Sequence, residues 1–108
     1  MPYLLILLEY KVNVNSKDGT GMTPLHWAAR MQNRDMIKLL LDFGADPNIQ
    51  DFEGATPLHI AADTVSYDCV ETLIIHGANP NIRNEFGTKA IELIKKRGHD
   101  KALEKSRF

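Results

Sequence analysis

The sequence predicts an all-α protein, a solenoid in which each unit consists of a turn followed by two helices. Two observations lead to this fold class. The segment TPLHWAA, which begins at Thr23, returns as TPLHIAA at Thr56, 33 residues later. The same shift aligns residues 18–50 with residues 51–83 without a gap. Self-similarity at a fixed period of this length is the signature of a repeat architecture.

The composition is that of an ordinary globular domain. The chain has 108 residues, of which 44% are hydrophobic and 25% charged, and its net charge is −1. A charge this small provides no strong field to attract nucleic acid or a membrane surface. The one long apolar run, YLLILL at residues 3–8, is too short to span a membrane. The single cysteine, Cys69, suits a reducing compartment, so we expect an intracellular protein of the cytoplasm, the nucleus or both.

The repeat frame divides the single domain, residues 1–108, into four units. Residues 1–17 align with the end of a unit and form a partial repeat. Residues 18–50 and 51–83 are complete repeats. Residues 84–108 align with the beginning of a unit but lose its Thr-Pro pair and its histidine. We expect this last unit to be a degenerate capping repeat, because terminal repeats of a solenoid present a polar outer face.

The first half of each unit predicts a turn and a short helix. Asp51 and Gly54 have the residue types favoured at the first and fourth positions of a turn. Thr56 suits a helix N-cap, and Pro57 suits the first helical position, where its missing N–H is no loss. His59 then falls at the third helical position, where its side chain can reach back to the cap as a glutamate does in a capping box.

The second half of each unit predicts a longer amphipathic helix. Asn33 and Ser66 are candidate N-caps, and Gly44 and Gly77 can take the left-handed conformation that ends a helix. Apolar residues between them recur at the spacing i, i+3, i+4 that defines one helix face. They are Ile37, Leu40 and Leu41 in one unit and Val70, Leu73 and Ile74 in the next.

A unit that reads DxxGxTPLHxAA and then LLLxxGADxN resembles the ankyrin repeat, and the resemblance covers nearly the whole chain. It implies an ankyrin-type stack with an L-shaped section, in which β-hairpin fingers project near residues 46–54 and 79–87. Gln32 and Val65 stand where the family usually has glycine, so we expect both loops between the helices to be less regular.

The two ends of the chain differ in apolar exposure. In the last unit, apolar residues can face inward while Lys95, Lys96 and Arg97 cover the end with charge. At the N-terminus the repeat frame begins inside a second helix, so we expect residues 4–8 to present an apolar face without cover. We expect an upstream repeat, a partner or a second copy of the chain to cover this face, because large apolar patches are rare on monomers.

The repeated histidines, His26 and His59, are better explained by architecture than by chemistry. Stacked helices lie about 8–10 Å apart, whereas zinc requires ligand nitrogens at about 2 Å. Neither histidine has a nucleophile at a spacing that would indicate a catalytic pair. The sequence also contains no phosphate-binding loop, Cys-x-x-Cys motif or acid pair. We therefore expect no enzyme activity, no metal and no cofactor. His76 and His99 are predicted to be surface residues.

Three further features have a structural explanation that we favour over a functional one. Cys69 is expected to be a packed thiol, and Trp27 is expected to pack in the core because its counterpart is the aliphatic Ile60. The basic tail after Lys89 is expected to be a solvated capping face rather than a nucleic-acid contact, because no aromatic residues or recognition helix accompany it.

The resemblance also implies where a partner binds, since ankyrin proteins usually meet partners at the finger tips and the concave face of the first helices. Phe52 and Phe86 are candidate apolar anchors with a polar rim, although packing of both rings on adjacent loops is an equal alternative. The residues at the implied positions are Gly19, Thr20, Met22, Arg30, Met31, Gln50, Phe52, Glu53, Ala55, Asp63, Thr64, Arg83, Glu85, Phe86 and Thr88.

The sequence therefore predicts a non-catalytic protein–protein interaction module or scaffold whose partner is another protein, not a nucleic acid or a membrane. The alternative is a stand-alone inhibitor, like the small ankyrin proteins that block cyclin-dependent kinases or transcription factors related to NF-kappaB. Asn48 also resembles a site for the asparaginyl hydroxylase of oxygen sensing, because Asp46 precedes it by two residues and Leu40 by eight. Hydrogen bonding of Asn48 within its own finger is the competing explanation.

Overall fold

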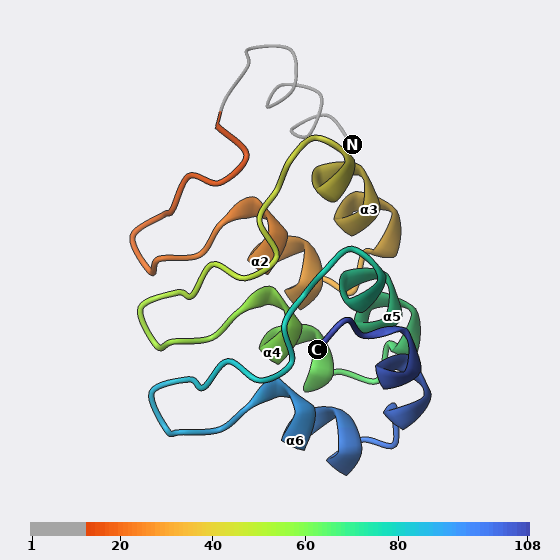
Figure 1. The fold of residues 1–108 in the computed structure, drawn as a ribbon. Coiled ribbons are helices and arrows are strands. Elements are labelled where there is room, and N and C mark those ends of the chain that lie inside the picture. The colour runs from red at the N-terminus through yellow and green to blue at the C-terminus, as the bar shows by residue number, and fades with distance from the viewer. Residues whose placement is uncertain (1–12) are drawn as a thin grey trace.

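The computed structural model describes residues 13–108, and the predicted apolar face at residues 4–8 lies outside this range. Figure 1 shows two columns of helices, with three loops projecting to one side. One column contains α2 (Pro24–Arg30), α4 (Pro57–Ala62) and α6 (Ala90–Lys96). The other contains α3 (Arg34–Asp42), α5 (Tyr67–Ile75) and the 3-10 helix η1 (Asp100–Lys105). This arrangement confirms an all-α solenoid in the described range.

In the first column, α2 and α4 begin as the sequence predicts. Thr23 and Thr56 are N-caps that accept a hydrogen bond from the backbone N–H of His26 and His59, respectively. Each imidazole Nδ1 accepts the backbone N–H of its threonine at 3.1 Å. The predicted capping boxes are therefore confirmed, and two otherwise unpaired N–H groups are satisfied at each helix start.

The helices of the second column also follow the predicted signals. The side chains of Asn33 and Ser66 accept the backbone N–H of Met36 and Cys69. The two helices are followed by glycines with φ of 92° and 95°, at Gly44 and Gly77. A residue with a side chain would be strained in this left-handed conformation, which explains the glycine after each helix.

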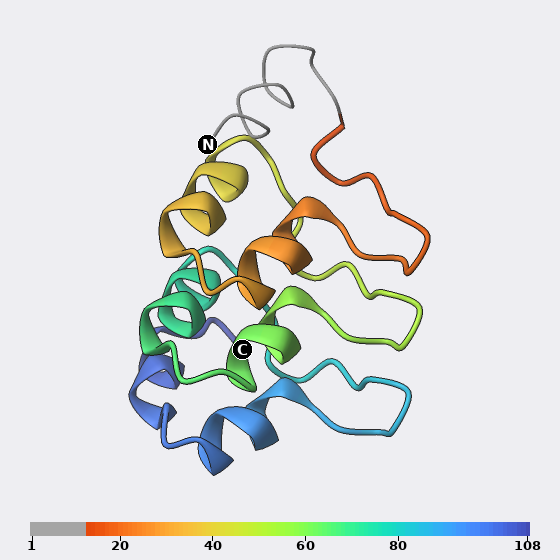
Figure 2. The same cartoon turned by 180° about the vertical axis from the view of Figure 1, so that it is seen from behind.

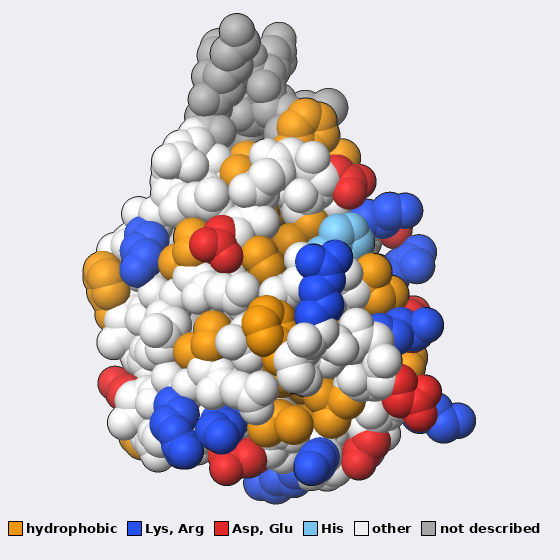
Figure 3. All heavy atoms as spheres, in the orientation of Figure 1, with side chains coloured by type: hydrophobic (Ala, Val, Ile, Leu, Met, Phe, Trp, Pro, Cys, Tyr) orange, Lys and Arg blue, Asp and Glu red, His pale blue; other side chains and the backbone are white. Residues whose placement is uncertain are grey.

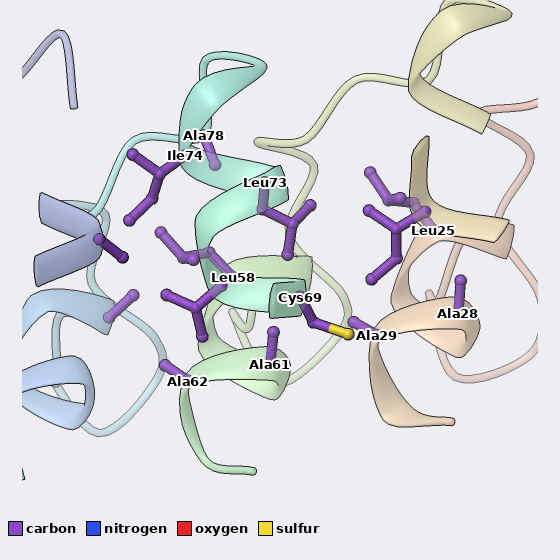
Figure 4. Close-up of a cluster of buried hydrophobic side chains, with 14 of the residues drawn as sticks. Leu25, Ala28, Ala29, Leu58, Ala61, Ala62, Cys69, Leu73, Ile74 and Ala78 are labelled. Carbon is purple, nitrogen blue, oxygen red and sulfur yellow. The ribbon is translucent and has the colours of Figure 1, made fainter. Parts of the chain in front are cut away.

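The core lies between the two helix columns. Leu25, Ile37, Leu58 and Leu73 are fully buried, and Figure 4 shows Leu58 and Leu73 pointing into the space between α4 and α5. Cys69 is part of the same cluster and is also fully buried, as predicted. Four alanines of α2 and α4 are also fully buried in this cluster: Ala28, Ala29, Ala61 and Ala62.

The predicted β-hairpin fingers are not confirmed. Within residues 13–108 the only β pairing is an isolated antiparallel bridge between Arg83 and Lys89. Each loop closes instead as a tight turn: the Asp51 carboxylate accepts the backbone N–H groups of Glu53 and Ala55, both at 2.9 Å. The aspartate thus satisfies donors that a longer ladder of strand hydrogen bonds would otherwise use.

Neighbouring loops are also joined to one another by hydrogen bonds. The backbone N–H of Phe52 donates to Thr20 O at 3.1 Å, and that of Glu85 donates to Glu53 O at 2.9 Å. The Gln50 side chain donates to Arg83 O at 2.9 Å. These bonds hold the three loops in one row.

The two loops between the helices, predicted to be less regular, differ from each other in backbone conformation. Gln32 takes the left-handed conformation with φ of 54°, the only positive φ of a non-glycine residue in the described range. Val65 does not take it. Its loop is closed by the Thr64 hydroxyl, which donates to Ala61 O at 2.6 Å and accepts the backbone N–H of Ser66 at 3.2 Å.

One predicted surface residue at the C-terminal end is in fact buried. His99 has only 8% of its surface exposed, and its Nε2 lies 3.1 Å from Thr64 O. The reason is tertiary, because η1 packs against α5 and brings His99 beside the Tyr67 ring, at 6.0 Å between centroids. The prediction for His76 holds, since it is exposed.

Candidate functional site

A groove of about 540 Å³ runs between the first helix column and the row of loops. Figure 2 shows α2, α4 and α6 stacked in front, with the three loops beside them. The lining of the groove comes from three successive units, so it can contact a chain segment that spans several units. Its lining consists of Met22, Arg30, Asp51, Glu53, Ala55, His59, Ile60, Asp63, Thr64, Asn84, Phe86, Thr88 and Leu93.

The apolar floor of the groove comes from one repeated helix position. Ile60 on α4 and Leu93 on α6 lie 33 residues apart, and both are half-buried and pack against the core. Met22 precedes α2 and is buried, whereas Phe86 lies on the third loop with 77% of its surface exposed. These side chains leave a strip of accessible apolar surface along the stack.

The structure brings together about half of the implied contact positions. Those in the groove lining are Met22, Arg30, Glu53, Ala55, Asp63, Thr64, Phe86 and Thr88. Those outside it are Gly19, Thr20, Met31, Gln50, Phe52, Arg83 and Glu85. The side chains of Gln50 and Arg83 are held against the backbone, because they donate to Gly54 O and Gly87 O at 2.9 and 3.0 Å.

Sequence reasoning did not assign five residues that line the groove. They are Asp51, His59, Ile60, Asn84 and Leu93. Asp51 and Asn84 fall in the lining because each one closes a loop that borders the groove. The repeat frame held a signal for Ile60 and Leu93, since both occupy the position of Trp27 in successive units.

Trp27 is the clearest correction to the sequence prediction. It does not pack in the core: 37% of its surface is exposed. Its indole N–H donates to the Asp18 carboxylate at 2.7 Å, and the Arg30 guanidinium lies 5.3 Å from the ring centroid. The indole N–H needs a hydrogen-bond acceptor, and Asp18 in the adjacent loop provides one at the surface.

Asp18 is held ionised by its surroundings. Its carboxylate accepts the Thr20 hydroxyl at 2.7 Å, the indole of Trp27 and the backbone N–H of Thr20 at 2.9 Å. These hydrogen bonds, led by that of the Thr20 side chain, lower the pKa of the carboxyl well below its usual range. The first loop is thereby tied to the Trp27 ring.

The two phenylalanines at the loop tips differ in their surroundings. The Phe52 ring lies close to Gly21, where an added Cβ would come within 2.6 Å of Phe52 Cδ1, and Lys17 Nζ lies 5.9 Å from the ring centroid. Phe52 therefore packs partly on the neighbouring turn. Even so, 67% of its surface is exposed, and for Phe86 the value is 77%. Both rings remain accessible to a partner.

The repeated histidines join each unit to the next one. His26 Nε2 lies 2.8 Å from Ala55 O, and His59 Nε2 lies 2.9 Å from Thr88 O. Because Nδ1 accepts a backbone N–H, Nε2 must carry the proton, and both rings are neutral. Burial lowers the pKa of His26. With both nitrogens engaged, neither imidazole is available as a base or a metal ligand.

Asn48 makes its side-chain hydrogen bonds to the next unit and not within its own loop. Its amide nitrogen donates to Gly77 O at 3.3 Å, and its amide oxygen accepts the backbone N–H of Asn79 at 2.7 Å. Asn15 repeats the pattern one unit earlier, with Gly44 O and the N–H of Asp46. The competing explanation for Asn48, bonding within one finger, is therefore wrong for its side chain.

Other kinds of site are not seen in the part of the chain that the structure describes. Residues 13–108 contain no group of three or more His, Cys, Asp or Glu residues that could bind a metal ion. None of the described helices is long and apolar enough to cross a membrane. Figure 3 shows acidic and basic side chains interspersed among neutral and hydrophobic ones over one face of the described residues.

Comparison with known proteins agrees with the repeat frame. A family model described as ankyrin repeats, in three copies, matches residues 2–84. No curated protein matches the chain.

Proposed function

The chain belongs to the ankyrin repeat family, whose repeats are in general protein–protein interaction modules, and we propose that it is a non-catalytic module that binds another protein through the groove. The observation that carries this proposal is the groove itself, with the apolar floor formed by Ile60 and Leu93 and the exposed ring of Phe86 at its edge. An apolar centre surrounded by polar side chains is the usual anatomy of a protein interface.

The residues around the groove also favour protein binding over binding of a small molecule. Tryptophan, tyrosine and arginine are the residue types that most often dominate binding energy at interfaces. Trp27 and Arg30 lie together beside the groove, and Arg30 is in its lining. The loop tips add Phe52 and Phe86, which extend the apolar surface beyond the groove.

The proposal is tested by affinity capture from cell extract with a matched pair of variants. Phe86→Ala removes an exposed ring in the groove, and Phe43→Ala removes a ring outside it that is 56% exposed. Truncation of either exposed side chain should leave the fold intact. We expect a protein that is retained by the wild type and by Phe43→Ala but lost from Phe86→Ala. Retention by all three chains would contradict binding through the groove.

The identity of the captured protein separates the two forms of this function. A single stoichiometric kinase or a transcription factor related to NF-kappaB would favour the stand-alone inhibitor over the scaffold. We propose that the protein acts inside the cell, in the cytoplasm or the nucleus. We also propose the division of the domain into a partial repeat (1–17), two repeats (18–50 and 51–83) and a capping repeat (84–108).

We further propose Asn48 as a hydroxylation site. Its motif includes Asp46, whose carboxylate accepts the Asn48 backbone N–H at 2.9 Å. Asn15 and Asn81 carry asparagine in place of that aspartate, so they serve as internal controls. Incubation with the asparaginyl hydroxylase should add one oxygen, which fragmentation mass spectrometry should locate at Asn48. An unchanged intact mass would rule the site out.

A further inference from the structure

We infer that the segment bound in the groove carries a Lys or Arg side chain flanked by apolar side chains, an inference that rests on the proposed function. The apolar requirement follows from the floor, where Ile60 and Leu93 offer half-buried aliphatic surface, and from the exposed ring of Phe86. Apolar side chains placed there gain roughly 25 cal/mol for each Å² that they remove from water.

The charge of the lining sets the second requirement. The groove is lined by three acidic side chains, Asp51, Glu53 and Asp63, and by one basic side chain, Arg30. The Arg30 guanidinium lies over the Trp27 ring, 5.3 Å from its centroid. The groove therefore has an excess of negative charge, although the chain as a whole is nearly neutral.

The three acidic groups are not equally available to a partner. The Asp51 carboxylate accepts two backbone N–H groups of its own loop. Asp63 Oδ1 lies 3.0 Å from Arg97 Nη2, so an exposed cation already balances this charge. Glu53 has neither a hydrogen bond nor an ion pair through its carboxylate among residues 13–108. It is the group that a partner's cation can engage.

A second glutamate and two phenylalanines lie on the same pair of loop tips as Glu53. The backbone N–H of Glu85 donates to Glu53 O at 2.9 Å, so the two glutamates are on neighbouring loop tips. Phe52 precedes one glutamate and Phe86 follows the other, and both rings are mostly exposed. A Lys or Arg side chain can place its charged end between the carboxylates while its aliphatic stem or guanidinium plane lies on a ring.

The same charges disfavour other partner segments. An Asp or Glu side chain, or a phosphate group, would approach unpaired carboxylates of the same sign. Charge complementarity of this kind selects among partners and speeds association more than it raises affinity. The acidic lining thus distinguishes a basic partner segment from an acidic one that presents the same apolar side chains.

The test selects peptides without assuming an identity. A phage-displayed random peptide library is panned against the 108-residue chain, and an enriched sequence is synthesised with a fluorescent label for anisotropy titration. We expect enriched sequences that combine Lys or Arg with neighbouring apolar residues. Their affinity should fall as the salt concentration rises, because salt screens exposed charges.

Matched variants test whether Glu53 is the residue that attracts the basic side chain of the peptide. Glu53→Gln should raise the dissociation constant roughly 2- to 5-fold, which is the effect of losing one exposed ion pair. Glu104→Gln makes the same change on η1, outside the groove, and should have no effect. A peptide with Gln in place of its basic residue should lose the same factor and become insensitive to Glu53→Gln. Glu53→Arg should favour a peptide in which Glu replaces the basic residue.

Two outcomes distinguish the inference from the function on which it rests. Peptides that lose binding in Phe86→Ala but contain no Lys or Arg, or ignore Glu53→Gln, would overturn the inference and leave the groove as a binding site. Peptides that bind Phe86→Ala as tightly as the wild type would contradict the proposed function, and the inference with it.

Discussion

At the residue scale, the side chains that define this protein make their most informative contacts with a neighbouring unit. Asn48 bonds to Gly77 O and to the N–H of Asn79, and His26 bonds to Ala55 O. Gln50 reaches Arg83 O in the same way. Asn48 and His26 therefore connect successive units, and we expect the loss of either side chain to lower the stability of the domain.

Asn48 and Asn81 provide a matched test of this view. Asn48→Ala removes both side-chain hydrogen bonds to the next unit and leaves the Gly77 carbonyl and the Asn79 N–H unpaired. We expect a loss of about 1–3 kcal/mol in the free energy of unfolding. Asn81 is exposed, and its side chain has no partner within residues 13–108. Asn81→Ala should change stability by less than about 0.5 kcal/mol.

Urea unfolding followed by circular dichroism measures both variants. Similar losses for Asn48→Ala and Asn81→Ala would contradict the inter-unit role of Asn48, because the two residues occupy the same position of the repeat. The slope of unfolding free energy against urea should stay unchanged if neither substitution alters the surface exposed on unfolding.

At the element scale, each helix depends on the group that begins it and on the residue that ends it. His26 has two roles, because it completes the cap of α2 and also bonds to the loop of the next unit. Gln32 ends α2 in a conformation that glycine adopts more easily. We expect protonation of His26 to lower the stability of the domain and the substitution Gln32→Gly to raise it.

We expect the domain to lose stability in mild acid through His26. Burial lowers its pKa in the folded state below the ordinary value of 6.5. Between the folded-state pKa and the unfolded-state pKa of His26, the unfolded chain therefore binds more protons than the folded chain. The stabilisation by neutral His26 is fully present above pH 6.5 and is lost as the pH falls through the folded-state pKa. Each unit of pKa difference corresponds to about 1.4 kcal/mol.

The control for this pH dependence is His26→Gln, which cannot titrate. The variant should be less stable than the wild type above pH 6.5, and its unfolding free energy should change less as the pH falls below that value. Parallel pH profiles of the two chains, measured by urea unfolding, would show that His26 is not the group responsible.

Gln32→Gly should stabilise the domain. A side chain at φ of 54° strains the backbone, by about 1–2 kcal/mol, and glycine avoids this strain at an entropic cost of about 0.5–1 kcal/mol. We therefore expect a net gain near 0.5–1 kcal/mol. Val65→Gly is the control, because Val65 does not have a positive φ and should gain nothing. Thermal unfolding of both variants decides whether strain at Gln32 is real.

At the scale of the whole molecule, stability comes from contacts between successive units. The described helices pack along each column, α2 on α4 and α4 on α6, and α3 on α5 and α5 on η1. In such a solenoid the stability is approximately a sum over units and their interfaces. A unit that lacks a neighbour on one side therefore forgoes an interface.

The predicted apolar face at residues 4–8 lies outside the described range and stays a prediction. A consensus capping repeat fused ahead of residue 1 should cover it. We expect the fused chain to be monomeric and to melt at a higher temperature than the original chain, because one interface is added. Sedimentation and thermal unfolding measure the two properties. Monomeric behaviour of both chains together with equal melting temperatures would show that these side chains already have cover.

The sequence by itself determined the features that depend on residues close together in the chain. Thr23, Pro24 and His26 fix the start of α2, and the same residue types fix the start of α4. The glycines after α3 and α5 fix their ends. These features could be predicted because each rests on local geometry and residue type.

Only the tertiary structure decided features that depend on how the units stack. It placed Trp27 at the surface beside Asp18 and Arg30, buried His99 beside Tyr67 and turned the Asn48 side chain toward the next unit. It also brought about half of the implied contact positions into one groove. The repeat frame specifies which residues are equivalent, but the hydrogen bonds of Asn48 and His99 depend on neighbours more than 30 residues away, which come into contact only when the units pack.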